Sequence, residues 1–313
     1  MTSPFRAELV DLFDKVKAVR RKGDPASALR LAGELGRRSI EILSECTRAA
    51  IQWDGRGTKS YSVFHCRGAP ITFSKAVNDA LFIEDPSLYA TGWKHLTDRV
   101  MVAGSGGGAL TEIDSGEVDR LIYSTVHAYA AGIDLYKRGD RGSPGSLLEQ
   151  IMGPICGVMT KRQEAGKIVL RAPGEAEPLS IEVDISFSDA SCRHVLVIAT
   201  KISSRERIVQ AYVHQFLLEK LDPGRFRTIL CLSNENNMFS TAIPPDERIA
   251  SKAVLRDTLV PGTIRIYQRY LTPLAGMYYL DPPASYVDGS TPGLPSVRRV
   301  GQLLCEDLPN LLS

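Results

Sequence analysis

The sequence has none of the features that mark a membrane or secreted protein. No apolar run approaches the roughly 18–20 residues that a membrane-spanning helix needs. Glu8, Asp11 and Asp14 fall where a secretory signal would have to be apolar. The six cysteines form no CxxC pair and no Cys/His ligand spacing, which disfavours a disulfide framework or a structural zinc site and favours buried free thiols. We therefore expect a cytoplasmic protein with no membrane partner.

A strong charge of one sign is also missing. The formal net charge of the 313 residues is +2, which does not by itself indicate a nucleic-acid-binding protein, although the first sixty residues carry more basic than acidic side chains. Hydrophobic residues make up 43% and charged residues 24%, an ordinary globular composition that argues against disorder. Any DNA-binding function must therefore depend on local clusters of residues.

The order of the predicted elements indicates an α/β fold with an N-terminal helical extension. Apolar residues recur at helical spacing from Leu9 to Val19, and Asp24-Pro25 is typical of a helix N-terminus. Gly104–Gly108 lacks the Gly-Lys-Ser/Thr of a phosphate-binding loop, so we disfavour a nucleotide-binding enzyme and expect a close approach to another backbone there. Predicted helices cover 9–19, 24–48, 116–136, 146–161 and 205–221, and predicted strands cover 167–171, 179–187, 195–201, 229–232 and 263–267.

Two neighbouring predicted strands carry residues suited to phosphodiester chemistry. In the first, Glu182 and Asp184 alternate with apolar residues, so we expect both carboxylates on one face. The second ends at Lys201, close to a carboxylate of the first if the two form a hairpin. A carboxylate can hold Mg²⁺, and a lysine can orient or help deprotonate an attacking water. A surface ion pair is the alternative.

Arg205, Glu206 and Arg207 follow at the start of a predicted helix. Each arginine can bind O6 and N7 of a guanine, and the glutamate can accept a hydrogen bond from N4 of a cytosine. The cluster can therefore read G·C pairs in the major groove. The alternative interpretation is a solvated, charged helix start.

Asp184, Ala199-Thr200-Lys201 and Arg205-Glu206-Arg207 together resemble the CCGG family of type II restriction endonucleases, and most closely the SsoII/PfoI-like branch that cuts CCNGG-containing sites. The resemblance implies a variant of the PD-(D/E)xK nuclease fold, an α/β fold with a mixed central sheet flanked by helices. In that variant the acid two residues before the lysine, here Ala199, is absent and comes from the following helix. In this sequence, the position of that helical acid holds His214 and Gln215. The alternative is that the nearest acid, Glu219, one turn further along the helix, has taken over this role.

The resemblance also assigns further site residues. Glu149 would be a third active-site acid that contacts the metal together with Asp184, although a buried or capping glutamate is an equal alternative. Arg48 and Trp53, expected at the end of the N-terminal helix, would form the pocket for a flipped base. The basic segments 20–22 and 37–38 would contact phosphates without reading sequence.

The function that follows is a Mg²⁺-dependent, sequence-specific endonuclease for double-stranded DNA. As a homodimer it would cut a palindromic site containing CC/GG pairs, of the CCNGG type with or without flanking bases, and leave a 5′-phosphate and a 3′-hydroxyl. A cognate DNA methyltransferase is expected in the same system. Residues 1–100 would form a helical, DNA-contacting region and residues 101–313 the catalytic core with a C-terminal extension, in one compact unit.

Two other functions fit the same residues. A nonspecific PD-(D/E)xK nuclease of defence or repair would lose rate on every substrate alike when Arg205 or Arg207 is changed. A non-catalytic DNA-binding protein, in which Asp184 and Lys201 form only an ion pair, would bind a specific site without cutting it at any metal concentration.

Overall fold

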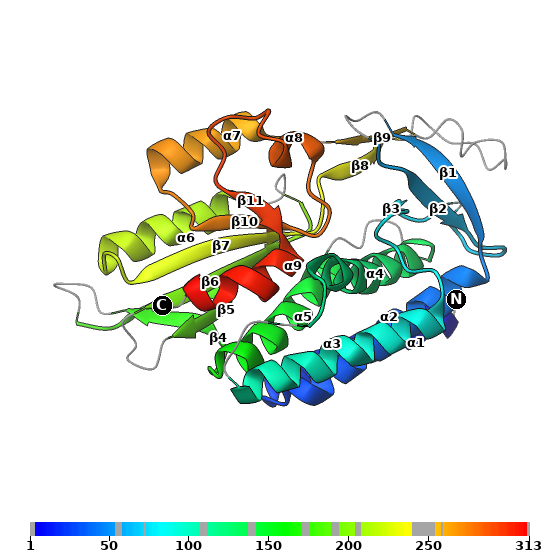
Figure 1. Cartoon of the computed structure of the whole chain (residues 1–313), viewed down its shortest axis with the longest axis horizontal. Helices are drawn as coiled ribbons and strands as arrows, with labels where there is room; N and C mark the ends of the chain where they lie inside the picture. The colour runs from blue at the N-terminus through cyan, green and yellow to red at the C-terminus, as the bar shows by residue number, and fades with distance from the viewer. Residues whose placement is uncertain are drawn as a thin grey trace.

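The fold is that of a computed structural model, which describes residues 4–53, 58–71, 73–106, 110, 112–136, 142–170, 176–188, 194–203, 208–239, 254–257 and 259–311. A six-stranded central sheet lies between two groups of helices, and a five-stranded sheet stands at one end of the molecule (Figure 1). No helix among these residues is both long enough and apolar enough to cross a membrane.

The central sheet is mixed. Its strand order is β11-β10-β7-β6-β5-β4, with antiparallel pairing from β4 to β6 and parallel pairing from β6 to β11. Parallel neighbours need a crossover connection, and the segment containing helix α6 connects β6 to β7. The strands span Ala165–Leu170 (β4), Leu179–Ser188 (β5), Val195–Lys201 (β6), Phe226–Leu232 (β7), Gly276–Tyr279 (β10) and Val297–Arg299 (β11).

Helices cover both faces of this sheet (Figure 1). Leu196 and Ile198 of β6 belong to the main core with the first five helices, whereas Val195 and Val197 pack with Leu218 of α6 on the opposite face. The two-residue period of a strand produces this division. The helices span Pro4–Arg21 (α1), Pro25–Ser44 (α2), Pro86–Gly106 (α3), Ser115–Asp134 (α4), Gly142–Thr160 (α5), Ile208–Leu221 (α6), Pro261–Ile266 (α7), Ala284–Val287 (α8), Val300–Gln302 (α9) and Leu308–Leu311 (α10), with π-helical turns at Tyr267–Leu271 (η2) and Leu303–Asp307 (η3).

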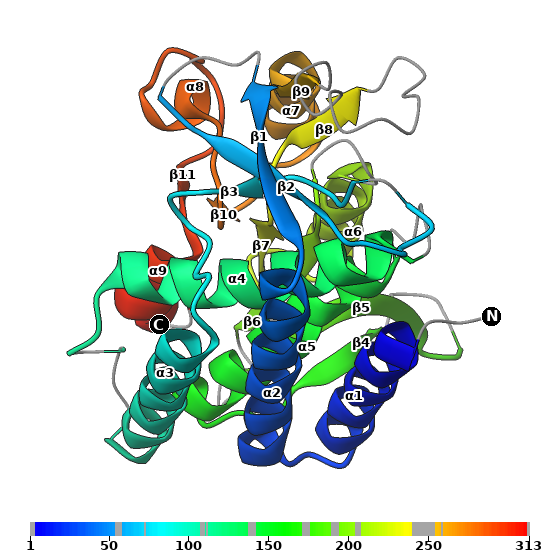
Figure 2. The same cartoon turned by 90° about the vertical axis from the view of Figure 1, so that its right-hand side faces the viewer.

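The second sheet has the order β3-β2-β1-β9-β8 and stands above α2 in the view of Figure 2. It is tied to the central sheet through Asp281, which follows β10. Lys59 Nζ donates to Asp281 Oδ1 at 2.5 Å, and the Tyr61 hydroxyl donates to Oδ2 at 2.9 Å. Its strands span Thr47–Trp53 (β1), Tyr61–His65 (β2), Val77–Asn78 (β3), Asn236–Phe239 (β8) and Val254–Asp257 (β9).

The helical N-terminus agrees with the pattern in the sequence. Asp24 caps α2, because its carboxylate accepts a hydrogen bond from the backbone N–H of Ser27 at 3.0 Å. The helix ends at Ser44, four residues before the predicted end at Arg48. The main core runs from Leu9 to Leu308, so the N-terminal helices and the central sheet share one core.

One expectation about secondary structure is wrong, and one helix has no counterpart among the predicted elements. The predicted strand 263–267 is helical, because Val260, Ile264, Tyr267 and Leu271 pack into one cluster at helical spacing. The β-branched residues of this segment suggested a strand, and tertiary packing overrides that propensity. The third helix, α3, was not predicted. Its buried residues nevertheless follow a helical period: Tyr89, Trp93, Leu96, Val100 and Ala103.

The glycine-rich segment and one pair of cysteines also differ from expectation. Gly104 lies in α3 rather than in a loop, and a Cβ there would lie 2.9 Å from the backbone oxygen of Val158, so the expected close approach is to α5. Cys46 and Cys66 form a disulfide, which corrects the expectation of free thiols for this pair. Cys156, Cys231 and Cys305 are free, and Cys192 lies outside the described residues.

A buried histidine in the core makes stability depend on pH. His127 of α4 is 6% exposed, and its Nε2 lies 2.6 Å from the Ser233 hydroxyl. Burial lowers the pKa of His127 to about 3, with Lys75 acting in the same direction and Asp281 opposing it. Since the unfolded chain takes up this proton near pH 6.5, the folded state loses stability as the pH falls from about 6.5 towards 3.

We expect His127→Gln to remove one proton from this pH dependence. The slope of the unfolding free energy against pH, measured by urea denaturation between pH 4.5 and 6.5, should fall by about 1.4 kcal/mol per pH unit. His95→Gln at an exposed position is the matched control and should leave the slope unchanged. Equal slopes for wild type and His127→Gln would contradict the assignment.

Candidate active site

Asp184 and Lys201 meet on neighbouring strands of the central sheet. Lys201 Nζ donates to Asp184 Oδ2 at 2.6 Å, and the backbone N–H of Thr200 donates to the same oxygen at 2.8 Å. The Asp184 and Lys201 side chains are 26% and 15% exposed, respectively. The pair is therefore partly buried and supported by a backbone donor, unlike an ordinary exposed surface ion pair.

A bulge in β5 sets the direction of Asp184. Lys167 of β4 lies opposite Glu182, whereas Ala165 lies opposite Ser186, so that residues 183–185 of β5 face Gly166 alone. A bulge of this kind bends the strand and re-aims a side chain.

The bulge also interrupts the alternation along the strand. Val183 packs with the cluster on the α6 side, whereas Ile185 belongs to the main core on the other face. The regular alternation expected around Glu182 and Asp184 is therefore interrupted between Val183 and Ile185. Of these two carboxylates, Asp184 alone lines the cavities described next, and Glu182 is exposed.

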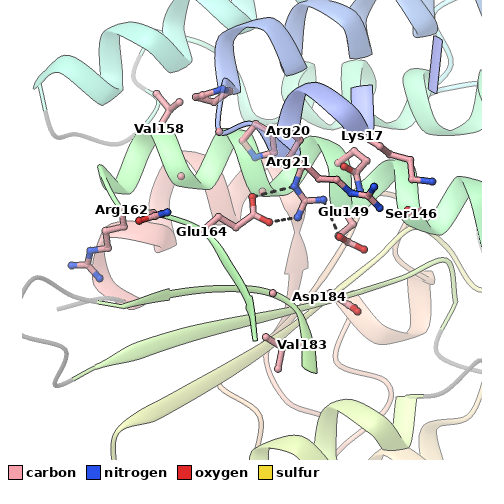
Figure 3. A pocket seen from close by; sticks show the side chains of 18 residues that line it. Lys17, Arg20, Arg21, Ser146, Glu149, Val158, Arg162, Glu164, Val183 and Asp184 are labelled. Atoms are coloured by element: carbon pink, nitrogen blue, oxygen red, sulfur yellow. Dashed lines mark hydrogen bonds and ion pairs between the residues drawn. The ribbon is translucent and has the colours of Figure 1, made fainter. Parts of the chain in front are cut away.

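The larger cavity, of about 570 Å³, lies between α1, α5 and the edge of the sheet and is lined by Asp184 and Glu149 (Figure 3). Arg20, in the last turn of α1, reaches into it. Its Nη1 donates to Glu149 Oε1 at 2.9 Å, its Nε donates to Glu164 Oε2 at 3.1 Å, and its Nη2 pairs with the other Glu164 oxygen. The structure thus brings Glu149, predicted from the sequence, into the same cavity as Asp184.

The carboxyl group of Glu149 has a perturbed pKa. Burial raises the pKa, the hydrogen-bonded Arg20 guanidinium opposes the rise, and the negative charges of Asp184 and Glu164 add to it. Perturbed carboxyl groups in a cavity are typical of functional sites. The sequence marks Arg20 only as part of the basic segment 20–22, expected to contact phosphates, and it does not mark Glu164, because these ion pairs join positions more than 120 residues apart.

His214 lies on the other side of Asp184. Together with Lys201, Gln210 and Thr228 it lines a small cavity between α6 and the sheet. Burial lowers the pKa of His214, the charge of Lys201 acts in the same direction, and the charge of Asp184 opposes it. At neutral pH the imidazole is therefore neutral and can accept or donate a hydrogen bond.

Gln215 and Glu219 do not line this small cavity. The Gln215 side chain donates to the carbonyl of Phe226 at 3.0 Å and accepts from the Thr228 hydroxyl at 2.6 Å, so it holds α6 against β7. Glu219 accepts from the backbone N–H of Gly224 at 3.0 Å in the turn after α6. Of the three candidates for the helical position, His214 is the one that lines the cavity with Asp184 and Lys201.

The predicted base-flip pair is not supported. Arg48 and Trp53 lie on strand β1 rather than at a helix end, and a separation of five positions along the strand corresponds to about 16 Å. Arg48 pairs with Asp79 and Glu84, while Trp53 Nε1 donates to Asp257 at 3.1 Å. The two side chains are therefore engaged separately and do not form one pocket.

Two further sets of residues that the sequence predicts to contact DNA remain. Arg205, Glu206 and Arg207 lie outside the described residues, between the end of β6 and the start of α6. Arg37 and Arg38 form ion pairs with the carboxylates of Glu8, Glu34 and Glu41. Their charges are therefore paired within the protein, which does not support the expected role in phosphate binding.

The carboxylate oxygens of Asp184 and Glu149 suit a hard divalent cation whose remaining ligands come from water and substrate. The described residues contain no group of three His, Cys, Asp or Glu side chains that could enclose an ion. The hydrogen bonds that Asp184 accepts from described residues all end on Oδ2, which leaves Oδ1 available, and Glu149 lines the same cavity. Mg²⁺ uses one or two carboxylates together with waters and substrate phosphates, so the residues fit Mg²⁺ better than caged zinc.

A solved structure of a restriction endonuclease has a similar fold. The crystal structure of the type IIP restriction endonuclease Kpn2I matches with a TM-score of 0.75 and 24% sequence identity, over 97% of this chain and 97% of that chain. No protein-family model matches the sequence. No curated protein matches it either. The likeness establishes the expected restriction-endonuclease-like α/β fold, with a mixed central sheet flanked by helices.

Proposed function

We propose that this chain is a Mg²⁺-dependent, sequence-specific endonuclease that hydrolyses phosphodiesters of double-stranded DNA. The observation that carries the proposal is the partly buried Asp184–Lys201 pair, 2.6 Å apart, in a fold shared with a type IIP restriction endonuclease. The cavity beside the pair, with Glu149 on its wall, offers room for a backbone phosphate and a cation.

The residues of the pair have separate tasks in this chemistry. Asp184 and Glu149 would hold Mg²⁺, which when bound lowers the pKa of a water and offsets charge on the phosphate. Lys201 is fixed by Asp184 Oδ2, so its ammonium can orient the attacking water and stabilise the charge that develops on the phosphate. His214, kept neutral by burial, can accept or donate a hydrogen bond at the edge of the site.

The recognition residues are proposed to be Arg205, Glu206 and Arg207. They follow Lys201 by four to six residues, a length of chain that spans at most about 14–22 Å. The reading residues can therefore lie at most about four to six base-pair steps from the cutting residues, since duplex DNA rises about 3.4 Å per base pair. Two arginines and a glutamate suit C·G pairs, which supports a palindrome with CC/GG pairs such as CCNGG.

A palindromic site implies two active sites related by two-fold symmetry, so we propose a homodimer in which each protomer cuts one strand. The products would be a 5′-phosphate and a 3′-hydroxyl. A nuclease of this kind endangers the DNA of its own cell, which supports a cognate methyltransferase as its partner.

The experiment that tests the function is digestion of a long plasmid by the purified chain with Mg²⁺, with Ca²⁺ and with EDTA, followed by sequencing of the ends. We expect discrete fragments only with Mg²⁺, all ending at one palindrome that contains CC/GG pairs. A smear would support a nonspecific nuclease instead. Intact DNA under every condition would overturn the catalytic roles of Asp184 and Lys201.

The same assay with Arg205→Ala separates specific from nonspecific cutting. Loss of one bidentate base contact should cost about 1–3 kcal/mol at the cognate site, a fall of roughly 5- to 150-fold in cleavage. Sites with a changed base pair at the contacted position should be affected less. An equal loss on all substrates would favour the nonspecific nuclease.

A further inference from the structure

Arg20 is a largely buried cation of the Asp184–Glu149 cavity, and the sequence marks it only as part of the basic segment 20–22. Its side chain is only 10% exposed, although it is the penultimate residue of the first helix. A buried guanidinium must find partners for its N–H groups, and here they go to two carboxylates of the same cavity.

The two carboxylates hold Arg20 differently. Glu164 takes two N–H groups, one on each oxygen, in the forked geometry that fixes a guanidinium plane. Glu149 receives a single hydrogen bond, from Nη1 to Oε1 at 2.9 Å. Glu164 therefore fixes the arginine, and the fixed arginine sets the position of one Glu149 oxygen.

The position of Glu149 makes this geometry consequential. Figure 3 shows its carboxylate between the Arg20 guanidinium and Asp184, on the wall of the shared cavity. Two carboxylates that are to share one cation repel each other before it arrives, and the arginine offsets part of this repulsion. A similar arrangement, in which an outer partner orients a metal ligand, is common around metal centres.

We infer that Arg20, locked by Glu164, is a positioning residue that holds Glu149 towards Asp184 for the metal. The N-terminal helix α1 thereby becomes part of the active site. The inference rests on the proposed nuclease function and deepens it. It assigns an active-site task to two residues, Arg20 and Glu164, that the function described above does not require.

The test is a double-mutant cycle with Arg20→Met and Glu149→Gln. Each change should lower single-turnover cleavage of a cognate duplex by roughly 10- to 100-fold. If Arg20 acts through Glu149, the double variant should be no slower than the slower single variant, since the interaction is already lost. Losses that multiply would overturn the inference.

A second measurement does not depend on turnover. Titration of Ca²⁺ into the complex of the full chain with the same duplex, by calorimetry, should show weaker binding for both single variants and no further loss in the double variant. Tighter Ca²⁺ binding by Arg20→Met would overturn the inference, because the arginine would then compete with the metal instead of positioning its ligand.

Two further variants guard against a folding defect. Arg298→Met is the matched control, because Arg298 also bridges two carboxylates, those of Glu306 and Asp307, but does not line the cavity. It should leave cleavage within about twofold of wild type. Arg20→Lys keeps the charge without the fork and should fold as wild type yet still cleave slowly. Wild-type cleavage by Arg20→Lys would overturn the inference.

Failure of the inference and failure of the proposed function have different signatures. A wild-type chain that cuts no DNA overturns the nuclease function itself. A wild-type chain that cuts DNA, together with an Arg20→Met variant that cuts equally fast, overturns the positioning role alone.

Discussion

Lys201→Met and Asp184→Asn should each reduce cleavage of the cognate duplex by roughly 10²–10⁴-fold. The lysine change removes the ammonium that Asp184 Oδ2 holds at 2.6 Å, and the aspartate change removes an anionic oxygen available to a metal. Binding to the uncut duplex should persist in Ca²⁺, because in the proposed function these residues act at the reacting phosphate and not at the base edges. Single-turnover cleavage and gel-shift titration measure the two effects separately.

The neighbouring strand offers a matched control. Lys167 of β4 is an exposed lysine opposite Glu182, so Lys167→Met removes the same charge a short distance from the site. It should leave the cleavage rate within about twofold of wild type. An equal loss from Lys167→Met and Lys201→Met would show that bulk charge, rather than a positioned ammonium, determines the rate.

Asp281→Ala should destabilise the fold by about 3–5 kcal/mol, because it removes one partner of a buried ion pair. Asp281 is 3% exposed and accepts from both Lys59 and the Tyr61 hydroxyl, so its loss removes the acceptor that these donors share, and Lys59 is left with the carbonyl of Pro282. Equilibrium urea denaturation measures the change.

The control for this prediction is Asp98→Ala. Asp98 pairs with Lys94 one turn away on α3, where the two side chains are 58% and 78% exposed, so its removal should change stability by less than about 1 kcal/mol. A similar small change in Asp281→Ala would mean that the ion pair does not hold the second sheet to the central one.

The sequence predicted most strongly where local patterns carry the structure. The helix N-terminus at Asp24-Pro25 and the strands around Asp184 and Lys201 followed from capping chemistry and alternation. The restriction-endonuclease-like fold followed from the family resemblance that a short motif carries. In contrast, 263–267 was misassigned because β-branched residues favour strands, and only the cluster that it packs against shows the helical period.

Contacts between residues far apart in the chain could not be predicted from the sequence. Arg20 is one of several basic residues at the end of a helix, and nothing near it in the chain distinguishes it from Arg21. Its partners Glu149 and Glu164 lie more than 120 residues away, so the pairing exists only after the main core has formed. The bulge at 183–185 was likewise hidden, since an alternating sequence gives no sign of where a strand stops being regular.

That bulge has a consequence for how such a chain can diverge. Residues before it pack on the α6 face of the sheet and residues after it pack in the main core, so the outer part of the hairpin is uncoupled from the register that sets Asp184 against Lys201. Insertions and deletions in the β4–β5 connection can therefore accumulate without moving the aspartate. Deletion of Ile185, on the inner side, would shift this register by one residue and turn the aspartate away from the lysine. Among relatives of this fold, we expect length variation to concentrate on the outer side of the bulge and to be absent within it.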